Sequence, residues 1–190
     1  MLLFVGLGNP TPDSENNRHN VGFKIIDSIN KKFSLSKQKP KFKGLLTTGN
    51  IASKKVYAIK PLTFMNNSGT AVKELIDYFK IDAKDVIVFH DDMDIDFGKI
   101  KAKFGGSSAG HNGIESIDKF IGKEYSRVRI GIGHPKQNKK VNNHVLEDFK
   151  EDEEEKIKEI TENIVKQIPT LIDKKMDLFS SKVNQNLNGI

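Results

Sequence analysis

Short apolar runs alternate along this chain with segments whose apolar residues recur at helical spacing, and this alternation restricts the folds open to it. Leu2–Leu7 and Val86–Phe89 are continuous apolar runs, as expected of strands buried on both faces of a sheet. Between them, the apolar residues of Val21–Phe33 fall on one helical face. Because strands that alternate with helices pack as a sheet covered on both sides, we expect an α/β fold, a three-layer α/β/α sandwich.

The rest of the chain supplies further elements of both kinds. Leu45–Ala52 and Lys55–Lys60 are strand-like and are joined by a tight turn near Ser53-Lys54, so the central sheet should be mixed and mostly parallel. Lys99–Phe104 and Arg127–Ile132 alternate polar and apolar residues and predict two more strands. The further expected helices run from an N-cap at Ser68 to Phe79, over Asn112–Ile121, and over 151–176 with a break near Pro169. Loops are expected at Pro61–Asn67 and Gly105–Gly110.

Length and composition favour one domain over residues 1–190, because 190 residues with 36% hydrophobic content can bury a single core. The absence of cysteine excludes disulfides, thiolate zinc sites, iron–sulfur clusters and a cysteine nucleophile. No run approaches eighteen apolar residues, and the apolar start lacks a basic leader, so we expect neither a membrane span nor a secretory signal. The expected location is the cytoplasm.

The positive charge is concentrated in one part of the chain. The formal net charge is +6, and residues 31–60 contain nine lysines and no acidic residue. Charge of one sign in one region suggests a polyanionic partner, of which nucleic acid is the commonest. The alternative is a solvated lysine-rich surface with no such partner.

The first candidate motif follows the first predicted strand. Gly6–Thr11 begins like a dinucleotide-binding loop, but Thr11 replaces the third glycine and Pro10 blocks the direct strand-to-helix turn. Nucleotide binding is therefore not favoured here. Asn9 lies at the carboxyl end of the strand, where open α/β sheets bind ligands, although an asparagine there can also serve only to form a turn.

A histidine directly precedes the first predicted helix. His19 lies two residues before Val21, and the positive end of a helix disfavours an imidazolium. We therefore expect His19 to be neutral near pH 7, the state that a general base needs. The alternative is an incidental residue at the start of a helix.

Four carboxylates follow the apolar run that ends at Phe89, between Asp91 and Asp96. They do not fit a calcium loop, because the glycine falls at Gly98 and Lys103 occupies the twelfth position. A magnesium site held by a few of these carboxylates is one alternative. The other is that one aspartate accepts the ring N–H of a histidine and so orients it for catalysis.

A glycine-rich loop precedes the helix expected at Asn112. Its glycines allow close backbone approach, and the N-terminus of the helix could donate amides to an anion. Asn112 with Glu115 also matches a capping box, which is a purely structural reading. Lys101 and Lys103 share one face of the preceding strand with Lys99 and could contact phosphates.

Five sequence blocks together resemble bacterial peptidyl-tRNA hydrolase, in the order and approximate spacing of that family. They are VGLGNP (5–10), RHNVG (18–22), KPLTFMNNSG (60–69), HDDMDIDFGKIKAKFGGSSAGHNG (90–113) and RVRIGIGHP (127–135). They span the first 135 residues, with a looser match in the tail. The resemblance implies a monomeric enzyme that hydrolyses the ester between a peptide and the 3′-terminal ribose of tRNA, with tRNA as its partner and no metal or other cofactor.

The resemblance also implies a role for individual residues. His19 matches the general base that activates water, Asp91 the aspartate that supports it, and Asn9 the residue that reads the peptide carbonyl. The other implied substrate-binding residues are Phe64, Met65, Asn66, His111 and Asn112. The implied tRNA-binding residues are Ser14, Lys101, Lys103, Arg127 and Arg129.

The chain departs from the family pattern near His19. Thr11, Ser14 and Asn17 stand where the family usually has Gly, Tyr and Thr. The missing tyrosine removes a ring that could stack on a nucleotide, which predicts weaker tRNA binding unless Phe64 compensates.

The sequence is also compatible with two other functions, and it suggests one structural hypothesis. The chain could bind RNA without hydrolysing it, or use the Asp91–Asp96 cluster as a metal-dependent phosphoesterase. Residues 136–176, a polar stretch followed by an amphipathic helix, are expected to form a mobile lid over the cleft.

Overall fold

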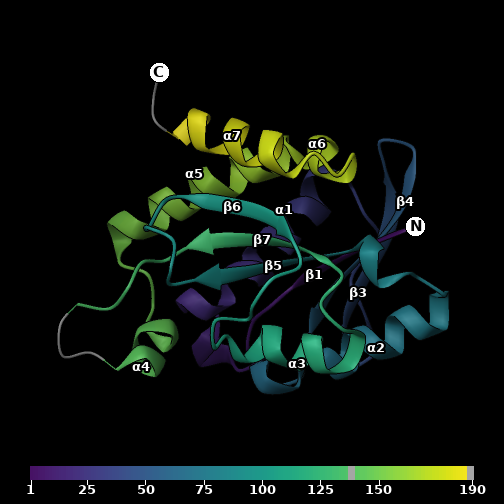
Figure 1. Cartoon of the computed structure of the whole chain (residues 1–190), viewed down its shortest axis with the longest axis horizontal. Coiled ribbons are helices and arrows are strands. Elements are labelled where there is room, and N and C mark those ends of the chain that lie inside the picture. Colours follow the sequence, from purple (N-terminus) through teal and green to yellow (C-terminus); the bar gives the residue numbers. More distant parts are fainter. Residues whose placement is uncertain (137–139, 188–190) are drawn as a thin grey trace.

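A seven-stranded mixed sheet forms the centre of the computed structural model, which describes residues 1–136 and 140–187 (Figure 1). Its spatial order is β2-β3-β4-β1-β5-β7-β6. The strands are β1 (Leu2–Gly6), β2 (Lys39–Lys41), β3 (Gly44–Ile51), β4 (Lys54–Pro61), β5 (Val86–Asp92), β6 (Ile100–Phe104) and β7 (Ser126–Gly131). The four central strands are parallel, whereas β2, β3 and β6 pair antiparallel with their neighbours.

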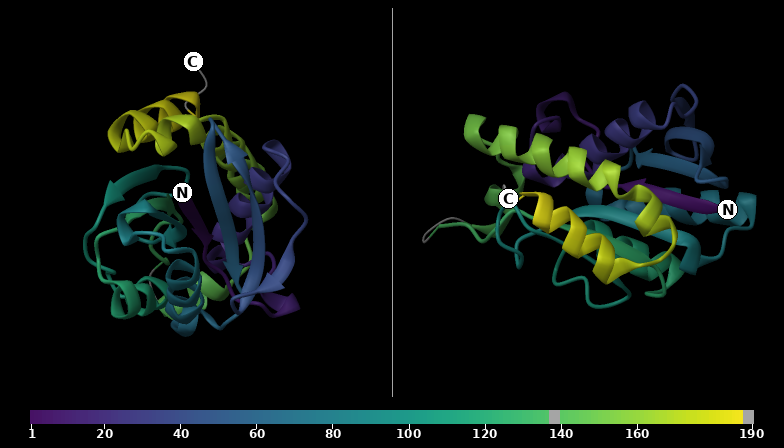
Figure 2. Two further views of the ribbon diagram at one scale, coloured as in Figure 1. Left: turned by 90° about the vertical axis from the view of Figure 1, so that its right-hand side faces the viewer. Right: turned by 90° about the horizontal axis from the view of Figure 1, so that it is seen from above.

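Helices cover both faces of this sheet, so the predicted three-layer α/β/α architecture is confirmed (Figures 1 and 2). One face packs against α1 (Val21–Lys32), α5 (Glu151–Lys166), α6 (Ile168–Ile172) and α7 (Met176–Leu187). The other packs against α2 (Ser68–Phe79) and α3 (Asn112–Ile121). The short α4 (Val141–Leu146) lies at the end of the sheet where β5 and β7 finish.

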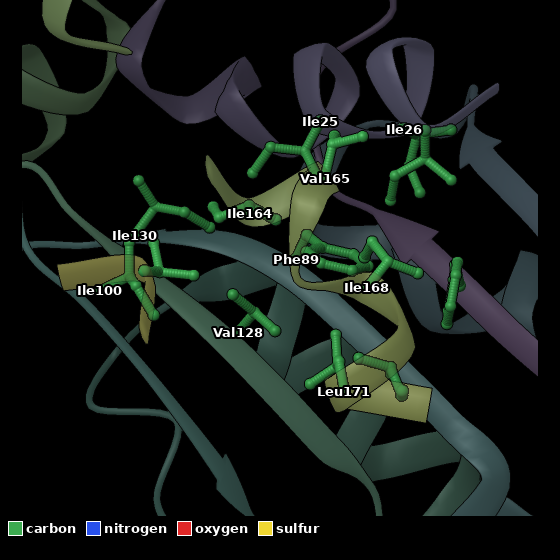
Figure 3. Packing of buried hydrophobic residues seen from close by; sticks show 14 of the residues in the cluster. Ile25, Ile26, Phe89, Ile100, Val128, Ile130, Ile164, Val165, Ile168 and Leu171 are labelled. Atoms are coloured by element: carbon green, nitrogen blue, oxygen red, sulfur yellow. The ribbon is translucent and has the colours of Figure 1, made fainter. Parts of the chain in front are cut away.

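Alternate residues of the central strands supply the two cores. In β5, Phe89 packs with the α1 and α5 side chains (Figure 3). Its neighbour Val88 packs on the opposite face, with the side chains of α2 and α3. The apolar stripe predicted on the C-terminal helix, including Ile160 and Ile164, is buried in the first core. Full burial of one such side chain contributes about 1.5–3 kcal/mol. Side chains of β1 and β5 are buried in both cores, so the positions of these two strands are held by packing on both faces of the sheet.

Several boundaries differ from the prediction. The strand predicted to end at Phe89 continues to Asp92, because β7 pairs with it through that residue. The predicted break of the 151–176 helix near Pro169 is confirmed, because α5 ends at Lys166 and α6 begins at Ile168, next to a proline that cannot donate a backbone hydrogen bond. Strand β2 and helix α7 were not predicted. β2 consists of three exposed residues without apolar alternation, so its sequence carries no strand signal.

Local turn chemistry also differs at two places. Ser68 is the first residue of α2 and not its N-cap, and its hydroxyl donates to the carbonyl of Met65. The preceding segment, expected as a loop, includes the short 3-10 helix η3 (Met65–Asn67). The hairpin turn lies at Ala52 and Ser53, both in the left-handed region with φ of 48° and 63°, one residue before the predicted position.

The expected lid over 136–176 includes residues 137–139, which lie outside the described residues. Within the described part, α5 contributes its apolar face to the core. Motion of the segment stays a prediction. Among the described residues, no helix has the length and apolar character needed to cross a membrane.

Candidate active site

The site forms where β1 and β5 end side by side. In the register of these parallel strands Gly6 lies opposite Phe89, so Asn9 and Asp91 follow at the same edge of the sheet. The short 3-10 helix η2 (Arg18–Asn20) places His19 beside them, immediately before α1. Open α/β sheets bind ligands at this edge, as the sequence argument expected for Asn9.

The central feature is a hydrogen-bonded pair of His19 and Asp91. The His19 Nδ1 lies 2.8 Å from Asp91 Oδ1 and 2.9 Å from Oδ2, and the exposed fractions of the two residues are 6% and 1%. Because an ionised carboxylate can only accept, Nδ1 donates, and the neutral ring therefore keeps its lone pair on Nε2. No hydrogen-bond partner for Nε2 occurs within 1–136 and 140–187. The predicted contact between these side chains is confirmed.

A second histidine shares the same carboxylate. His111 Nε2 donates to Asp91 Oδ1 at 2.9 Å, while its Nδ1 accepts from the backbone N–H groups of Gly113 and Ile114 at 3.1 and 3.3 Å. These bonds fix the tautomer of His111 and make it the N-cap of α3. The expectation that Asn112 caps this helix is wrong. Asn112 is its first residue, because the extended backbone of His111 already aims a ring nitrogen at the free amides.

Electrostatics at the pair differ from the expectation based on the helix alone. Burial opposes the charged form of His19, but the adjacent Asp91 carboxylate outweighs burial and raises the pKa of the imidazole above 6.5. The predicted direction of the shift is therefore wrong, since the full charge of Asp91 at 2.8 Å outweighs the partial charge of a helix end. Burial favours protonated Asp91, yet His19 and His111 together hold the pKa of this carboxyl far below its usual range.

A third histidine lies beneath the pair. His90 is buried, and its Nδ1 donates to the carbonyl of Asp91 at 2.8 Å. Burial, followed by the proximity of His111, lowers the pKa of His90 to about 3, so the ring is neutral at pH 7. The sequence did not predict that His90 lies beside this pair, because only the pairing of β5 in the sheet shows that its side chain points inward.

Asn9 is held by three hydrogen bonds, which leave its side-chain NH₂ group available. Asn20 clamps its backbone, accepting from the Asn9 N–H and donating to its carbonyl, both at 2.9 Å. The Asn9 Oδ1 accepts from the Met65 N–H at 2.9 Å. The Nδ2 group of Asn9 therefore has no partner within the described part of the chain and can donate to a ligand.

Two cavities open at this edge of the sheet. The smaller, about 60 Å³, is lined by His19, Asp91, His111 and Asn112 together with part of α4. A neighbouring one of about 330 Å³ is lined by Asn9. Met65 is buried against α3, so that a Cβ on Gly113 would meet its sulfur. The two other predicted substrate residues, Phe64 directly before η3 and Asn66 within it, are exposed and line neither cavity.

The predicted tRNA-binding residues fall into two groups. Lys101 and Lys103 of β6 lie opposite Arg129 and Arg127 of β7, and Lys101 is exposed while Lys103 is half-buried. Partial burial, followed by the proximity of Arg127, Arg129 and Lys101, lowers the pKa of Lys103. The arginines point to protein groups instead. Arg127 is buried and donates to two carbonyls of the glycine-rich loop, and Arg129 donates to Asp92 at 2.7 Å.

Ser14 is likewise turned inward. It is buried, and its hydroxyl lies 2.7 Å from that of Thr11. A tRNA contact through its side chain was predicted from the resemblance and stays a prediction.

One group of described residues has the geometry to hold a metal ion. His19, Asp91 and His111 offer ligand atoms within 4.8 Å of one another. The acidic residues that follow have other partners, since Asp92 accepts from Arg129 and Asp94 lies 3.0 Å from His134. The carboxylate cluster therefore does not converge on one point.

Comparison with known proteins agrees with this geometry. The family described as Peptidyl-tRNA hydrolase matches residues 3–189. The chain belongs to the peptidyl-tRNA hydrolase family. A peptidyl-tRNA hydrolase of Pelagibacter ubique (strain HTCC1062) is 76% identical over 184 residues, which cover 97% of this chain and 99% of the relative. One from Bartonella henselae is 43% identical over 189 residues, covering 100% and 98%.

Solved structures give the same assignment. The crystal structure of peptidyl-tRNA hydrolase from Acinetobacter baumannii superposes with a TM-score of 0.90 at 31% identity, covering 97% of this chain and 94% of that one. As a member of the peptidyl-tRNA hydrolase family, the chain is a hydrolase, and the predicted fold and enzyme class are confirmed.

Proposed function

We propose that the chain hydrolyses the ester that joins a peptide to tRNA and that His19 is the general base. The observation that carries this is the buried contact of His19 Nδ1 with Asp91, which directs the lone pair of Nε2 away from the carboxylate. Family membership supports the substrate class. The roles of individual residues rest on the geometry and on the sequence resemblance.

In the proposed reaction, Nε2 of His19 takes a proton from water while the water oxygen attacks the ester carbonyl carbon. The resulting imidazolium is stabilised by Asp91, which already raises the pKa of the ring. The tetrahedral intermediate then breaks its bond to the ribose oxygen, which leaves with the proton held by His19. A positioned base of this kind contributes about 10²–10⁴-fold to the rate.

Asparagine side chains would position the substrate around this base. The available Nδ2 of Asn9 can donate to the peptide carbonyl, and loss of one donor to a developing oxyanion costs about 10²–10³-fold. Asn112 and His111 line the same cavity as His19. Met65 donates its backbone N–H to Asn9, and substrate contacts of the exposed Phe64 and Asn66 are implied by the sequence resemblance. No step in this scheme requires a metal or other cofactor.

The tRNA would bind through its phosphates. Lys101 and Lys103 extend from β6, and contacts of this type do not depend on base sequence. Arg127 and Arg129 would act mainly by shaping this surface, because both donate to protein groups. A monomeric state and a cytoplasmic location stay predictions.

Release of the peptide from N-acetyl-aminoacyl-tRNA tests the proposal. The wild-type chain should cleave this substrate and spare the unacetylated form, and His19→Ala should lower kcat by about 10²–10⁴-fold while tRNA binding remains. An unchanged rate in His19→Ala would refute the role of His19. Binding without turnover in the wild type would favour an RNA-binding protein, and inhibition by EDTA would favour the metal-dependent phosphoesterase.

A further inference from the structure

The residue before the proposed base is a buried cation with an unusual set of partners. Arg18 is 3% exposed, and a guanidinium is costly to bury unless its donors are satisfied. Its Nη2 donates to Glu153 Oε2 at 2.8 Å, and its Nη1 lies 3.3 and 3.4 Å from the carbonyls of Glu147 and His144. One side chain thus reaches three points of a distant part of the chain.

All these partners belong to residues 144–153, which run from the last turn of α4 to the first turn of α5. Backbone hydrogen bonds join the same two segments. The Arg18 N–H donates to the Glu147 carbonyl at 3.0 Å, and the Phe149 N–H donates to the Asn16 carbonyl at 3.2 Å. The ring of Phe149 also lies 5.6 Å from the guanidinium carbon. Arg18 therefore ties the segment that carries His19 to residues 144–153 through both its backbone and its side chain.

Residues 144–153 continue directly from a wall of the catalytic cavity. Val141, Asn142 and Val145 of α4 line the cavity that contains His19 and Asp91. At the end of α4, the carbonyl of His144 accepts from Arg18, while its ring Nε2 lies 3.0 Å from the carbonyl of Gly133. The position of this wall and the position of the base thus depend on the same guanidinium.

We propose that Arg18 is a positioning residue that fixes His19 against Asp91 and fixes α4 as the wall of the same cavity. The inference rests on the proposed function, in which His19 is the base. Lysine cannot replace arginine here, because an ammonium lacks the planar fork that reaches two carbonyls and a carboxylate at once. A shift of about 1 Å in a catalytic group can cost about 10²-fold in rate.

The test compares Arg18→Lys and Glu153→Gln with a matched control. Lys174→Met removes an ion pair to Asp85, 2.8 Å long, which also joins distant segments but lies outside the site. For each variant, kcat and KM on N-acetyl-aminoacyl-tRNA are measured across pH 5.5–9, and the unfolding midpoint is measured in urea.

For Arg18→Lys we expect kcat to fall about 10–10²-fold and the acid limb of kcat/KM to move to lower pH, because a looser pair with Asp91 raises the pKa of His19 less. Glu153→Gln keeps the contacts with the two carbonyls and should show a smaller change in the same direction, and it carries the test if Arg18→Lys does not fold. Lys174→Met should keep the wild-type rate and pH profile. A lower unfolding midpoint for Arg18→Lys with an unchanged acid limb would show a merely structural role and overturn the proposal.

A second readout does not depend on turnover. The Nδ1 proton of His19, which lies between the ring and Asp91, should give a downfield NMR resonance that is absent from His19→Ala. In Arg18→Lys this resonance should shift or broaden, and an unchanged resonance would also overturn the proposal. A wild-type chain without turnover would refute the proposed function while the resonance still decides whether Arg18 positions His19.

Discussion

Replacement of Asp91 by asparagine is the most informative perturbation of the proposed base. Asp91 accepts from His19 through both carboxylate oxygens and also from His111. An amide oxygen in the Oδ1 position could still accept from both rings, but its NH₂ group would then face the Nδ1 proton of His19 at a distance where a donor cannot be tolerated. The ring of His19 is expected to move its proton to Nε2, which removes the lone pair that accepts a proton from water.

Two quantities should therefore change together in Asp91→Asn. The rate constant kcat should fall by about 10²–10⁴-fold, the usual contribution of a general base. The acid limb of kcat/KM should move from above pH 6.5 to below it, because Asp91 is what raises the pKa of His19 against the opposing effect of burial. Each unit of that shift corresponds to about 1.4 kcal/mol of lost interaction with the imidazolium.

The assay is peptide release from N-acetyl-aminoacyl-tRNA at pH 5.5–9, with tRNA binding measured separately. Asp77→Asn is a matched control, because this carboxylate pairs with Lys73 on the exposed surface of α2. The reasoning is refuted if Asp91→Asn binds tRNA, folds, and keeps both the wild-type kcat and the wild-type acid limb.

Two further predictions concern binding and stability. Replacing Lys101 and Lys103 by serine should weaken tRNA binding. The slope of log K against log salt should become shallower by about 0.7–0.9 for each phosphate that is no longer neutralised. An unchanged slope would mean that the phosphates bind elsewhere. His90 has a folded-state pKa of about 3, so the unfolded chain binds a proton first as the pH falls below about 6.5. The free energy of unfolding should therefore fall by about 2 kcal/mol more between pH 7 and pH 5 in the wild type than in His90→Gln; urea titrations that show equal losses would contradict this.

The layered fold was predictable because strands that are buried on both faces are continuous apolar runs in the sequence. Val86–Phe89 is a continuous apolar run, which predicted a strand buried on both faces of the sheet. The three residues that follow are polar and do not predict a strand. His90, Asp91 and Asp92 extend β5 because Arg129, Ile130 and Gly131 of β7 pair with them, and that partner is distant in sequence.

The contact between His19 and Asp91 was predictable, but the other hydrogen bonds around it were not. The resemblance brought His19 and Asp91 together, although 72 residues separate them. Nothing in the sequence showed that His111 would cap α3 with one ring nitrogen and bind Asp91 with the other. Cap choice here depends on a tertiary contact, so the local pattern of Asn112 and Glu115 indicated the wrong residue.

The same contacts explain why His19 is the one of three clustered histidines that can act as a base. His90 and His111 each donate one ring N–H to Asp91, to its carbonyl and its carboxylate respectively. His90 is enclosed, with its second nitrogen buried, and His111 uses its second nitrogen to accept from two backbone amides. Within the described residues, His19 alone combines a hydrogen bond to the carboxylate with a ring nitrogen that has no partner and faces the cavity.

If His111 were the base instead, its Nδ1 would have to release the backbone amides of α3 in every turnover, so the start of that helix would loosen as the reaction proceeds. Retention of activity in His19→Ala together with its loss in His111→Gln would be the result that this reasoning excludes.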